Sequence, residues 1–288
     1  MPKQSYSLEF QPKERRHRDQ VMRFLGGFFA IVLLLGIVSA VALFREDLWA
    51  QFQGALNPTE TATEPPEDFW THTGSAALLL CETDDEQQSL RFCILVRADI
   101  SNRKIHIFPL SPKALTPHET GERTLEQALR EGGPKELKAA AEALTEGTID
   151  RFICSGDSAF VSAVNRLTGL TGSVTVHVEE RIDYHSADLD FLITKGENVP
   201  LSGDSLLRYF RYLGTLGENG TPAQGGLMQR VLEACLSSKP DAQALESLFN
   251  TLMNMLQTDV TVNDFYTRRA MLLDILASGD KFTVDVKE

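Results

Sequence analysis

A single stretch of the sequence, FLGGFFAIVLLLGIVSAVALF from Phe24 to Phe44, runs for 21 residues without a charged side chain. An α-helix of this length spans the hydrocarbon core of a bilayer, so we expect one transmembrane helix here. Six Lys or Arg residues and only three acidic residues precede it, which favours a cytoplasmic N-terminus. A cleaved signal peptide is the alternative, because Ala40-Val41-Ala42 resembles a small-residue cleavage site. In both cases the rest of the chain lies outside the cytoplasm.

The transmembrane helix divides the chain into four predicted parts. Residues 1–23 form a basic cytoplasmic tail and residues 24–44 the membrane span. Residues 45–73 are rich in Pro, Thr and Glu, and this composition is typical of an extracellular spacer. Residues 74–288 are long enough to form one folded extracellular domain. The expected location is therefore the cell membrane, as a single-pass protein.

The charge distribution excludes one broad class of function. The whole chain has a formal net charge of −12, and the first 23 residues contribute about +3, so the remainder carries about −15. General nucleic-acid binding requires cations that neutralise phosphates. We therefore expect no nucleic-acid partner.

Four cysteines, Cys81, Cys93, Cys154 and Cys235, are the only candidates for disulfide bonds. Disulfides are compatible with an extracellular domain. Each cysteine lies in an apolar segment, however, and none has the spacing of a metal site. We expect buried free thiols that pack as small hydrophobic side chains.

The folded domain alternates between apolar runs typical of strands and amphipathic stretches typical of helices. Three strands are predicted first, at residues 75–82, 90–99 and 104–110, the first two buried on both faces. Residues 214–226 are rich in glycine and predict a loop. The interleaving predicts an α/β or α+β fold with a covered sheet. The other predicted elements are a helix at 124–147 interrupted at Gly132-Gly133-Pro134, strands at 149–155, 172–180 and 281–286, and helices at 157–170, 205–213, 227–236, 242–257 and 264–278.

The segment LSGDSLLRYFRYL, residues 201–213, combines an apolar face with a cationic one. Leu206, Phe210 and Leu213 share one face of a helix. Arg208 and Arg211 share another, three residues apart. Two guanidinium groups on one helical face indicate a candidate binding site. Alternatively, they form a solvated helix face that contacts no ligand.

The order of these segments resembles the extracellular domain of the LytR–CpsA–Psr family. LLLCETDD at residues 78–85 resembles the family's opening strand and the turn after it, and residues 201–213 resemble its LxGxxALxYxRxR segment. Residues 124–178 follow the family's order, and LMQRVLEACL at residues 227–236 resembles the helix that carries RQQ. The resemblance covers about residues 74–235, and it rests on the order of the segments rather than on one motif.

The resemblance implies a central mixed sheet with helices on both faces and a phosphotransferase activity. Family members move an anionic glycopolymer from a polyprenyl pyrophosphate carrier to peptidoglycan with a divalent cation, and the isoprenoid tail lies in a hydrophobic tunnel. By this resemblance Arg211 is the candidate catalytic residue, and it binds the pyrophosphate together with Arg208. Mg²⁺ is the implied metal, with Asp84 and Asp85 as its candidate ligands. The alternative role for these two aspartates is a turn between strands.

The sequence departs from the family's catalytic pattern at several positions. Arg91 stands about where active members have the aspartate of RSD, and FPLSPKAL replaces SIPRD, which leaves Lys113 near the arginine position. Leu213 replaces the second arginine of RxR, and Arg230 remains near RQQ in a shifted register. Arg91, Lys113 and Arg230 are therefore displaced cations and further candidates for pyrophosphate binding.

Three interpretations follow from these residues. The first is a membrane-anchored envelope protein that binds a polyprenyl-pyrophosphate-linked glycopolymer or a related ligand, with weakened or lost phosphotransferase activity. The second is a divergent active phosphotransferase, in which Asp84, Arg91, Lys113 and Arg211 converge on one cleft. The third is a membrane protein with an outer protein-interaction domain, in which these residues do not cluster.

Overall fold

The structure is a computed structural model that describes residues 75–119, 121–171, 173–238, 241–278 and 281–287. The predicted tail, transmembrane helix and spacer lie outside these residues. None of the helices in the described ranges combines the length and the apolar character that a bilayer crossing requires.

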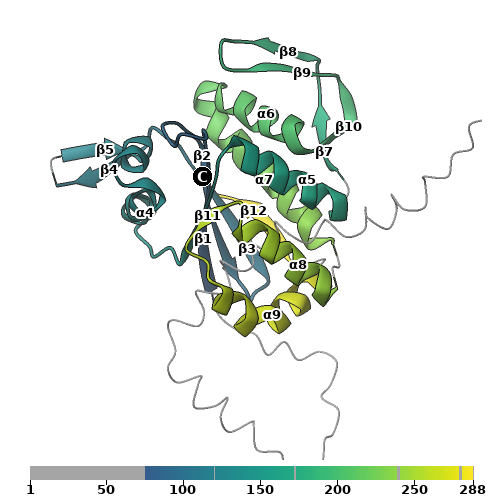
Figure 1. Cartoon of the computed structure of the whole chain (residues 1–288). Coiled ribbons are helices and arrows are strands. Elements are labelled where there is room, and N and C mark those ends of the chain that lie inside the picture. Colours follow the sequence, from purple (N-terminus) through teal and green to yellow (C-terminus); the bar gives the residue numbers. More distant parts are fainter. Residues whose placement is uncertain (1–74, 120, 172, 239–240, 279–280, 288) are drawn as a thin grey trace, which may run out of the picture.

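A six-stranded mixed sheet forms the centre of the domain (Figure 1). β1 (Ser75–Thr83) pairs antiparallel with β2 (Leu90–Asp99) and parallel with β6 (Arg151–Ser155), and β12 (Thr283–Val286) pairs parallel with β3 (Lys104–Leu110). The three strands predicted first are confirmed, and the two central ones are almost entirely buried because both of their faces are apolar. In spatial order the strands are β11 (Gln257–Thr258), β6 (Arg151–Ser155), β1 (Ser75–Thr83), β2 (Leu90–Asp99), β3 (Lys104–Leu110) and β12 (Thr283–Val286).

Helices cover both faces of this sheet, as expected (Figure 1). On one face α4 (Leu125–Thr145) packs against side chains such as Leu79 and Leu95. It has a kink at Gly133, next to Pro134, which confirms the predicted interruption. The opposite face is covered by α5 (Asp157–Thr171), α6 (Gly203–Gly214), α7 (Gly220–Leu236), α8 (Ala242–Met253) and α9 (Val262–Ala277).

An aromatic cluster fixes α5 and α6 against the sheet. The ring of Phe92 on β2 lies 4.9 Å from that of Phe210 on α6, centroid to centroid. Phe160 of α5 meets both rings edge-on, at 5.9 and 6.0 Å. All three side chains are almost fully buried. The predicted apolar stripe of α6 is therefore confirmed, and it determines which face of the helix remains available for a site.

Short paired strands lie outside the main sheet. The hairpin of β8 (Ile182–His185) and β9 (Asp190–Ile193) rests on α6, because Phe191 stacks on Tyr209 and Tyr212 with ring centroids 5.7 and 5.8 Å apart. The sequence pattern predicts β7 but not the others. These pairs are β4 (Leu115–His118) with β5 (Gly121–Thr124), β7 (Val174–Val178) with β10 (Gly196–Leu201), and β8 (Ile182–His185) with β9 (Asp190–Ile193).

The glycine-rich segment 214–226 is not a loop throughout, contrary to expectation. A short 3₁₀ helix, η1 (Gly217–Asn219), is followed directly by α7, which begins at Gly220. A Cβ atom on Gly225 would lie 2.9 Å from Pro109 and 3.0 Å from Val286. Glycine thus allows α7 to pack closely on β3 and β12, and this packing outweighs its low helix propensity.

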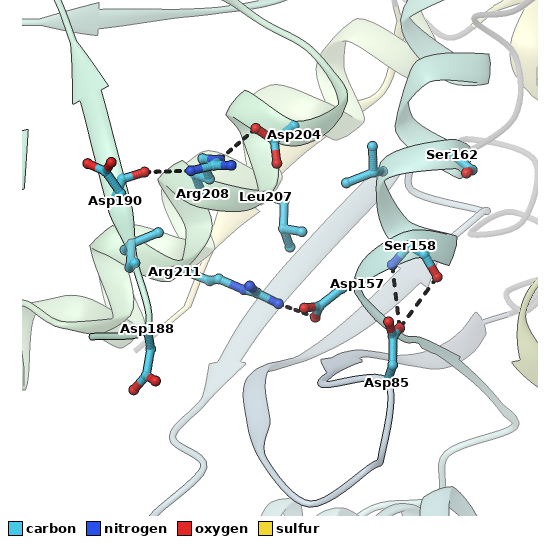
Figure 2. Close-up of a pocket in the computed structure, with 12 residues that line it drawn as sticks. Asp85, Asp157, Ser158, Ser162, Asp188, Asp190, Asp204, Leu207, Arg208 and Arg211 are labelled. Atoms are coloured by element: carbon cyan, nitrogen blue, oxygen red, sulfur yellow. Dashed lines mark hydrogen bonds and ion pairs between the residues drawn. The ribbon is translucent and has the colours of Figure 1, made fainter. Parts of the chain in front are cut away.

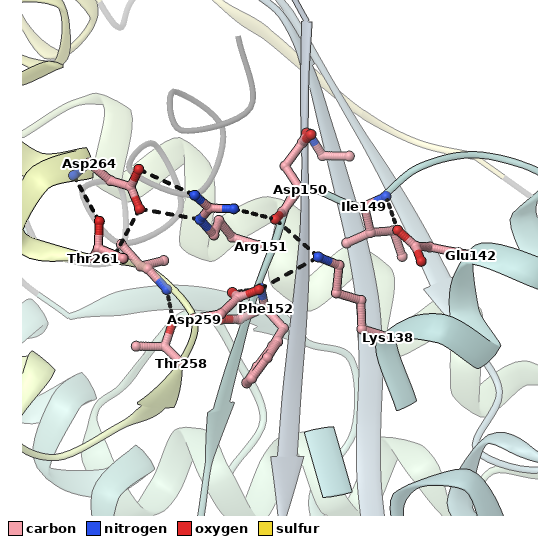
Figure 3. Close-up of polar contacts among 12 residues, drawn as sticks. Lys138, Glu142, Ile149, Asp150, Arg151, Phe152, Thr258, Asp259, Thr261 and Asp264 are labelled. Atoms are coloured by element: carbon pink, nitrogen blue, oxygen red, sulfur yellow. Dashed lines mark hydrogen bonds and ion pairs between the residues drawn. The ribbon is translucent and has the colours of Figure 1, made fainter. Parts of the chain in front are cut away.

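Polar contacts attach the C-terminal segments to the start of β6 (Figure 3). The Asp259 carboxylate accepts a hydrogen bond from the backbone N–H of Phe152 at 2.7 Å. Arg151 pairs with Asp264 across 3.2 Å, and Lys138 of α4 lies 3.5 Å from Asp259. We call these five residues the base network.

The four cysteines are buried thiols that are not joined in disulfides in the described structure, which confirms the expectation from their apolar surroundings. Cys81 of β1 lies beside Cys93 of β2 and Cys154 of β6 in the strand register. Desolvation raises the pKa of the Cys93 thiol, so this side chain behaves as a hydrophobic one.

Candidate functional site

A polar cleft of 530 Å³ lies between α5 and α6 (Figure 2). The turn after β1 and the tip of the β8–β9 hairpin complete its wall. The lining contains five aspartates and only two arginines, so negative charge predominates. The lining residues are Asp85, Asp157, Ser158, Val161, Ser162, Asp188, Leu189, Asp190, Asp204, Leu207, Arg208 and Arg211.

Arg211 is the cation at the inner end of this cleft. Its Nη2 donates to Oε1 of Glu82, at the end of β1, over 2.8 Å. The same nitrogen donates to the carboxylate of Asp157, the first residue of α5. The Arg211 side chain is 16% exposed, that of Asp157 36%, and that of Glu82 0%. We call these three residues the cleft network; it joins β1, α5 and α6.

Glu82 is buried because the side chains of β1 point alternately to the two faces of the sheet, and both faces are covered. It lies on the same face as Leu78 and Leu80, which points into the main hydrophobic core. Burial raises the pKa of Glu82 to about 9, against the lowering effect of Arg211. In the described part of the chain, Glu82 Oε2 and Arg211 Nε are buried atoms without a hydrogen-bond partner. The cleft network is thus held together by the hydrogen bonds of Arg211 Nη2, while two of its buried polar atoms lack a partner.

Arg208, the second predicted cation of α6, lies at the rim. Its Nε donates to Asp204 one turn earlier at 2.6 Å, and its Nη1 donates to the backbone carbonyl of Asp190 at 2.6 Å (Figure 2). The side chain is 42% exposed. The structure therefore brings Arg208 and Arg211 to one cleft, with different degrees of burial.

Asp84 and Asp85 have different surroundings. The carboxylate of Asp84 accepts the backbone N–H of Gln88 at 2.6 Å, within the turn between β1 and β2. Desolvation raises the pKa of Asp84, but hydrogen bonds from Gln88 and Ser89 outweigh it, so the net pKa is lowered. Asp85 lines the cleft, and its Oδ1 lies 3.5 Å from the N–H and the hydroxyl of Ser158.

The two predicted magnesium ligands do not both line the cleft. Asp84 serves the turn, and only Asp85 reaches the cleft. Within the ranges that the structure covers, no group of three or more His, Cys, Asp or Glu side chains is arranged to hold a metal ion. We therefore assign no chemical step to Mg²⁺.

The three displaced cations do not line the cleft. Arg91 is the extra residue at the register shift between β1 and β2, and its carbonyl accepts a hydrogen bond from Gln224 of α7 at 3.3 Å. Lys113 is exposed in the turn after β3, and Arg230 is exposed on α7. The convergence of Asp84, Arg91, Lys113 and Arg211 on one cleft does not occur.

Sequence reasoning missed two residues of the cleft network, Glu82 and Asp157. Glu82 ends the run SAALLLCE, and a carboxylate on the buried face of a central strand requires a cationic partner. That alternation was a usable signal for Glu82. Asp157 resembles any acidic residue that begins a helix. Its contact with Arg211 joins positions far apart in the chain, and no local pattern indicates it.

Comparisons with known proteins identify the class. The domain has a mixed sheet with helices on both faces and a polar cleft between α5 and α6. The profile of the LytR_cpsA_psr family matches residues 103–285, which is more than half of the chain. The chain therefore belongs to the LytR–CpsA–Psr family. The comparison with curated proteins gives no match.

Several solved structures share the fold at low sequence identity. One, described as a putative transcription regulator from Eubacterium siraeum, has a TM-score of 0.63 at 14% identity and covers 80% of this chain and 89% of its own. TagV of B. subtilis has a TM-score of 0.58 at 16% identity, covering 76% and 86%. TagT bound to LI-WTA has a TM-score of 0.52 at 16% identity, covering 74% and 77%. At these identities the likeness concerns the fold alone.

Proposed function

We propose that the chain is a membrane-anchored cell-envelope protein that binds a polyprenyl-pyrophosphate-linked glycopolymer or a related ligand in the cleft between α5 and α6. Its phosphotransferase activity is weakened or lost. The observation that carries this proposal is the cleft network, in which the central cation Arg211 is already paired with Glu82 and Asp157.

Phosphoryl transfer requires positive charge that stabilises the developing negative charge of the transition state. In this cleft the carboxylates outnumber the guanidinium groups, and both arginines have anionic or carbonyl partners within the protein. Ligand binding requires less positive charge than catalysis does, because one accessible guanidinium group can still hold a phosphate oxygen. The site is therefore better suited to holding a ligand than to transferring a phosphoryl group.

Family membership supports the glycopolymer as ligand. TagT, which shares the fold, has been captured with LI-WTA and with LIIa-WTA. The aromatic cluster of Phe92, Phe160 and Phe210 fills the space between β2, α5 and α6. We therefore place the ligand's polar head in the cleft and do not place its tail among these rings. Peptidoglycan as acceptor belongs to the alternative, an active phosphotransferase.

The full chain, purified in detergent, tests this proposal by titration with a polyprenyl pyrophosphate, with and without Mg²⁺. Arg211→Ala is measured in parallel, because loss of a charge-assisted contact to phosphate weakens binding by about ten- to a hundredfold. A transfer assay with a glycopolymer-linked donor and peptidoglycan runs beside it. Circular dichroism verifies that the variant is folded.

Arg211-dependent binding without metal dependence and without turnover is the expected result. Binding that requires Mg²⁺ and leads to transfer would establish the active enzyme instead. If neither protein binds, both glycopolymer functions are wrong, and the outer protein-interaction domain remains.

A further inference from the structure

The contacts of Arg211 indicate that one of its two carboxylate partners lies where an anionic ligand would bind. Glu82 and Asp157 both accept hydrogen bonds from Nη2 of Arg211, and in the described structure Nη1 makes no hydrogen bond. A phosphate binds a guanidinium group most strongly when it accepts from two N–H groups side by side. In the present arrangement Asp157 accepts from Nη2, so this nitrogen is not available for one of the two hydrogen bonds to a phosphate.

The two carboxylates differ in their freedom to leave. Glu82 is entirely enclosed by the core and cannot turn toward solvent. Asp157 is 36% exposed at the cleft wall, so its carboxylate can rotate into water at little cost in desolvation. An incoming anion therefore displaces Asp157 and not Glu82.

We propose that Asp157 is an internal occupant of the anion subsite at Arg211, displaced when a phosphate group enters, and that Glu82 is the positioning residue that holds the guanidinium group in place. This inference rests on the proposed function, since it concerns the same cleft. The inference makes Asp157 a specificity-determining residue. Only an anion that binds Arg211 strongly enough to displace the Asp157 carboxylate gains access to the guanidinium group.

Titration calorimetry with inorganic pyrophosphate tests the displacement, using the full chain in detergent, a metal chelator and constant ionic strength. Asp157→Asn removes the competing charge and should tighten binding about tenfold, as expected for one charge-assisted contact. Asp188→Asn is the matched control, because Asp188 lines the same cleft and has no hydrogen bond to Arg211 in the described structure. It should change the affinity less than about threefold, because its charge is screened by water and salt and it does not compete for the N–H groups of Arg211.

Two variants of Glu82 test the positioning role. Glu82→Gln keeps an acceptor for Nη2 and should bind pyrophosphate within about threefold of the wild type, whereas Glu82→Ala should bind about tenfold more weakly. Equal affinities for the two variants would contradict the positioning role. Circular dichroism verifies the fold of each variant, and Asp157→Ser replaces Asp157→Asn if the latter perturbs α5.

The outcomes separate this inference from the proposed function. If wild-type binding depends on Arg211 but Asp157→Asn binds no more tightly than Asp188→Asn, the displacement is wrong and the proposed function stands. If Asp157→Asn binds where the wild type does not, and Asp157→Asn combined with Arg211→Ala abolishes binding, the displacement is supported. If no variant binds, both are overturned.

Discussion

Two polar networks lie at opposite ends of the parallel strands β1 and β6, and they are built differently. In the base network, carboxylates accept hydrogen bonds from backbone N–H groups: Asp259 from Phe152, and Asp264 from Thr261 at 2.8 Å (Figure 3). In the cleft network, two carboxylates share one guanidinium nitrogen of Arg211. Buried atoms of Glu82 and Arg211 lack partners there, within the part of the chain that the structure covers.

The difference indicates a difference in role. Buried polar groups are nearly always hydrogen-bonded in folded proteins, because an unpaired one is costly. The base network follows this rule, so its function is to stabilise the attachment of α9 and β11 to the sheet. The cleft network departs from it beside an open cleft. Such a departure is typical of a place where a ligand or water completes the hydrogen bonds.

The largest expected effect is on the base network. Asp264→Ala removes the ion pair with Arg151 and the reciprocal capping bonds with Thr261. We expect a loss of about 3 kcal/mol in the free energy of unfolding, since a nearly buried cation then loses its partner. Chemical denaturation followed by far-ultraviolet circular dichroism measures it. Asp264→Asn is the control and should recover part of the loss, because the amide oxygen still accepts hydrogen bonds.

The stability that Asp264 contributes should depend on pH. Desolvation raises the pKa of Asp264, but its hydrogen bonds outweigh that effect and the net pKa is lowered. Its contribution to stability is therefore present above the ordinary pKa of aspartate and is lost as the pH falls below it. If Asp264→Ala lowers the free energy of unfolding by less than about 0.5 kcal/mol at neutral pH, Asp264 contributes no more than a typical surface residue, and the stabilising role of the base network is wrong.

The contribution of Glu82 in the cleft network to the free energy of unfolding should change with pH in the opposite direction to that of Asp264. Burial raises the pKa of Glu82 from 4.5 to about 9, so between these values the folded state binds one more proton than the unfolded chain. The free energy of unfolding then falls as the pH rises through this interval. Glu82→Gln removes the effect and should be more stable than the wild type by about 1–2 kcal/mol at pH 8 and no more stable near pH 4.5.

Denaturation of both proteins across this pH range measures the difference. A variant that is less stable than the wild type at pH 8 would show that Glu82 is ionised there and stabilises the fold through Arg211. The contrast between the two networks would then disappear, because both would depend on ionised carboxylates.

Most of the fold was predictable from the sequence because its elements follow local periodicity. The apolar runs of β1 and β2 and the stripe of Leu206, Phe210 and Leu213 could be assigned from spacing alone. The start of α7 was not predictable. Glycines favour loops locally, and only the close approach of Gly225 to Pro109 explains a helix there.

The candidate site was predictable in part. Arg208 and Arg211 were candidates because of their spacing on α6, and the resemblance to the family implied Asp84 and Asp85. Of these four residues, Asp85, Arg208 and Arg211 line the cleft. The partners of Arg211 were not, because Glu82 and Asp157 reach it through the tertiary fold. Local sequence indicates which side chains share a face, but it does not indicate which distant carboxylates neutralise them.

The smallest expected effect distinguishes the two arginines of α6. Arg208 is exposed and pairs with Asp204 one turn away, and such pairs contribute about 0.5 kcal/mol or less. Arg208→Ala should therefore leave the free energy of unfolding almost unchanged and weaken pyrophosphate binding less than about threefold, because salt and water already screen this cation. Arg211→Ala should weaken it far more. If both substitutions weaken binding equally, the ligand is held at the rim by two equivalent cations, and the buried position of Arg211 beside Glu82 has no special part in recognition.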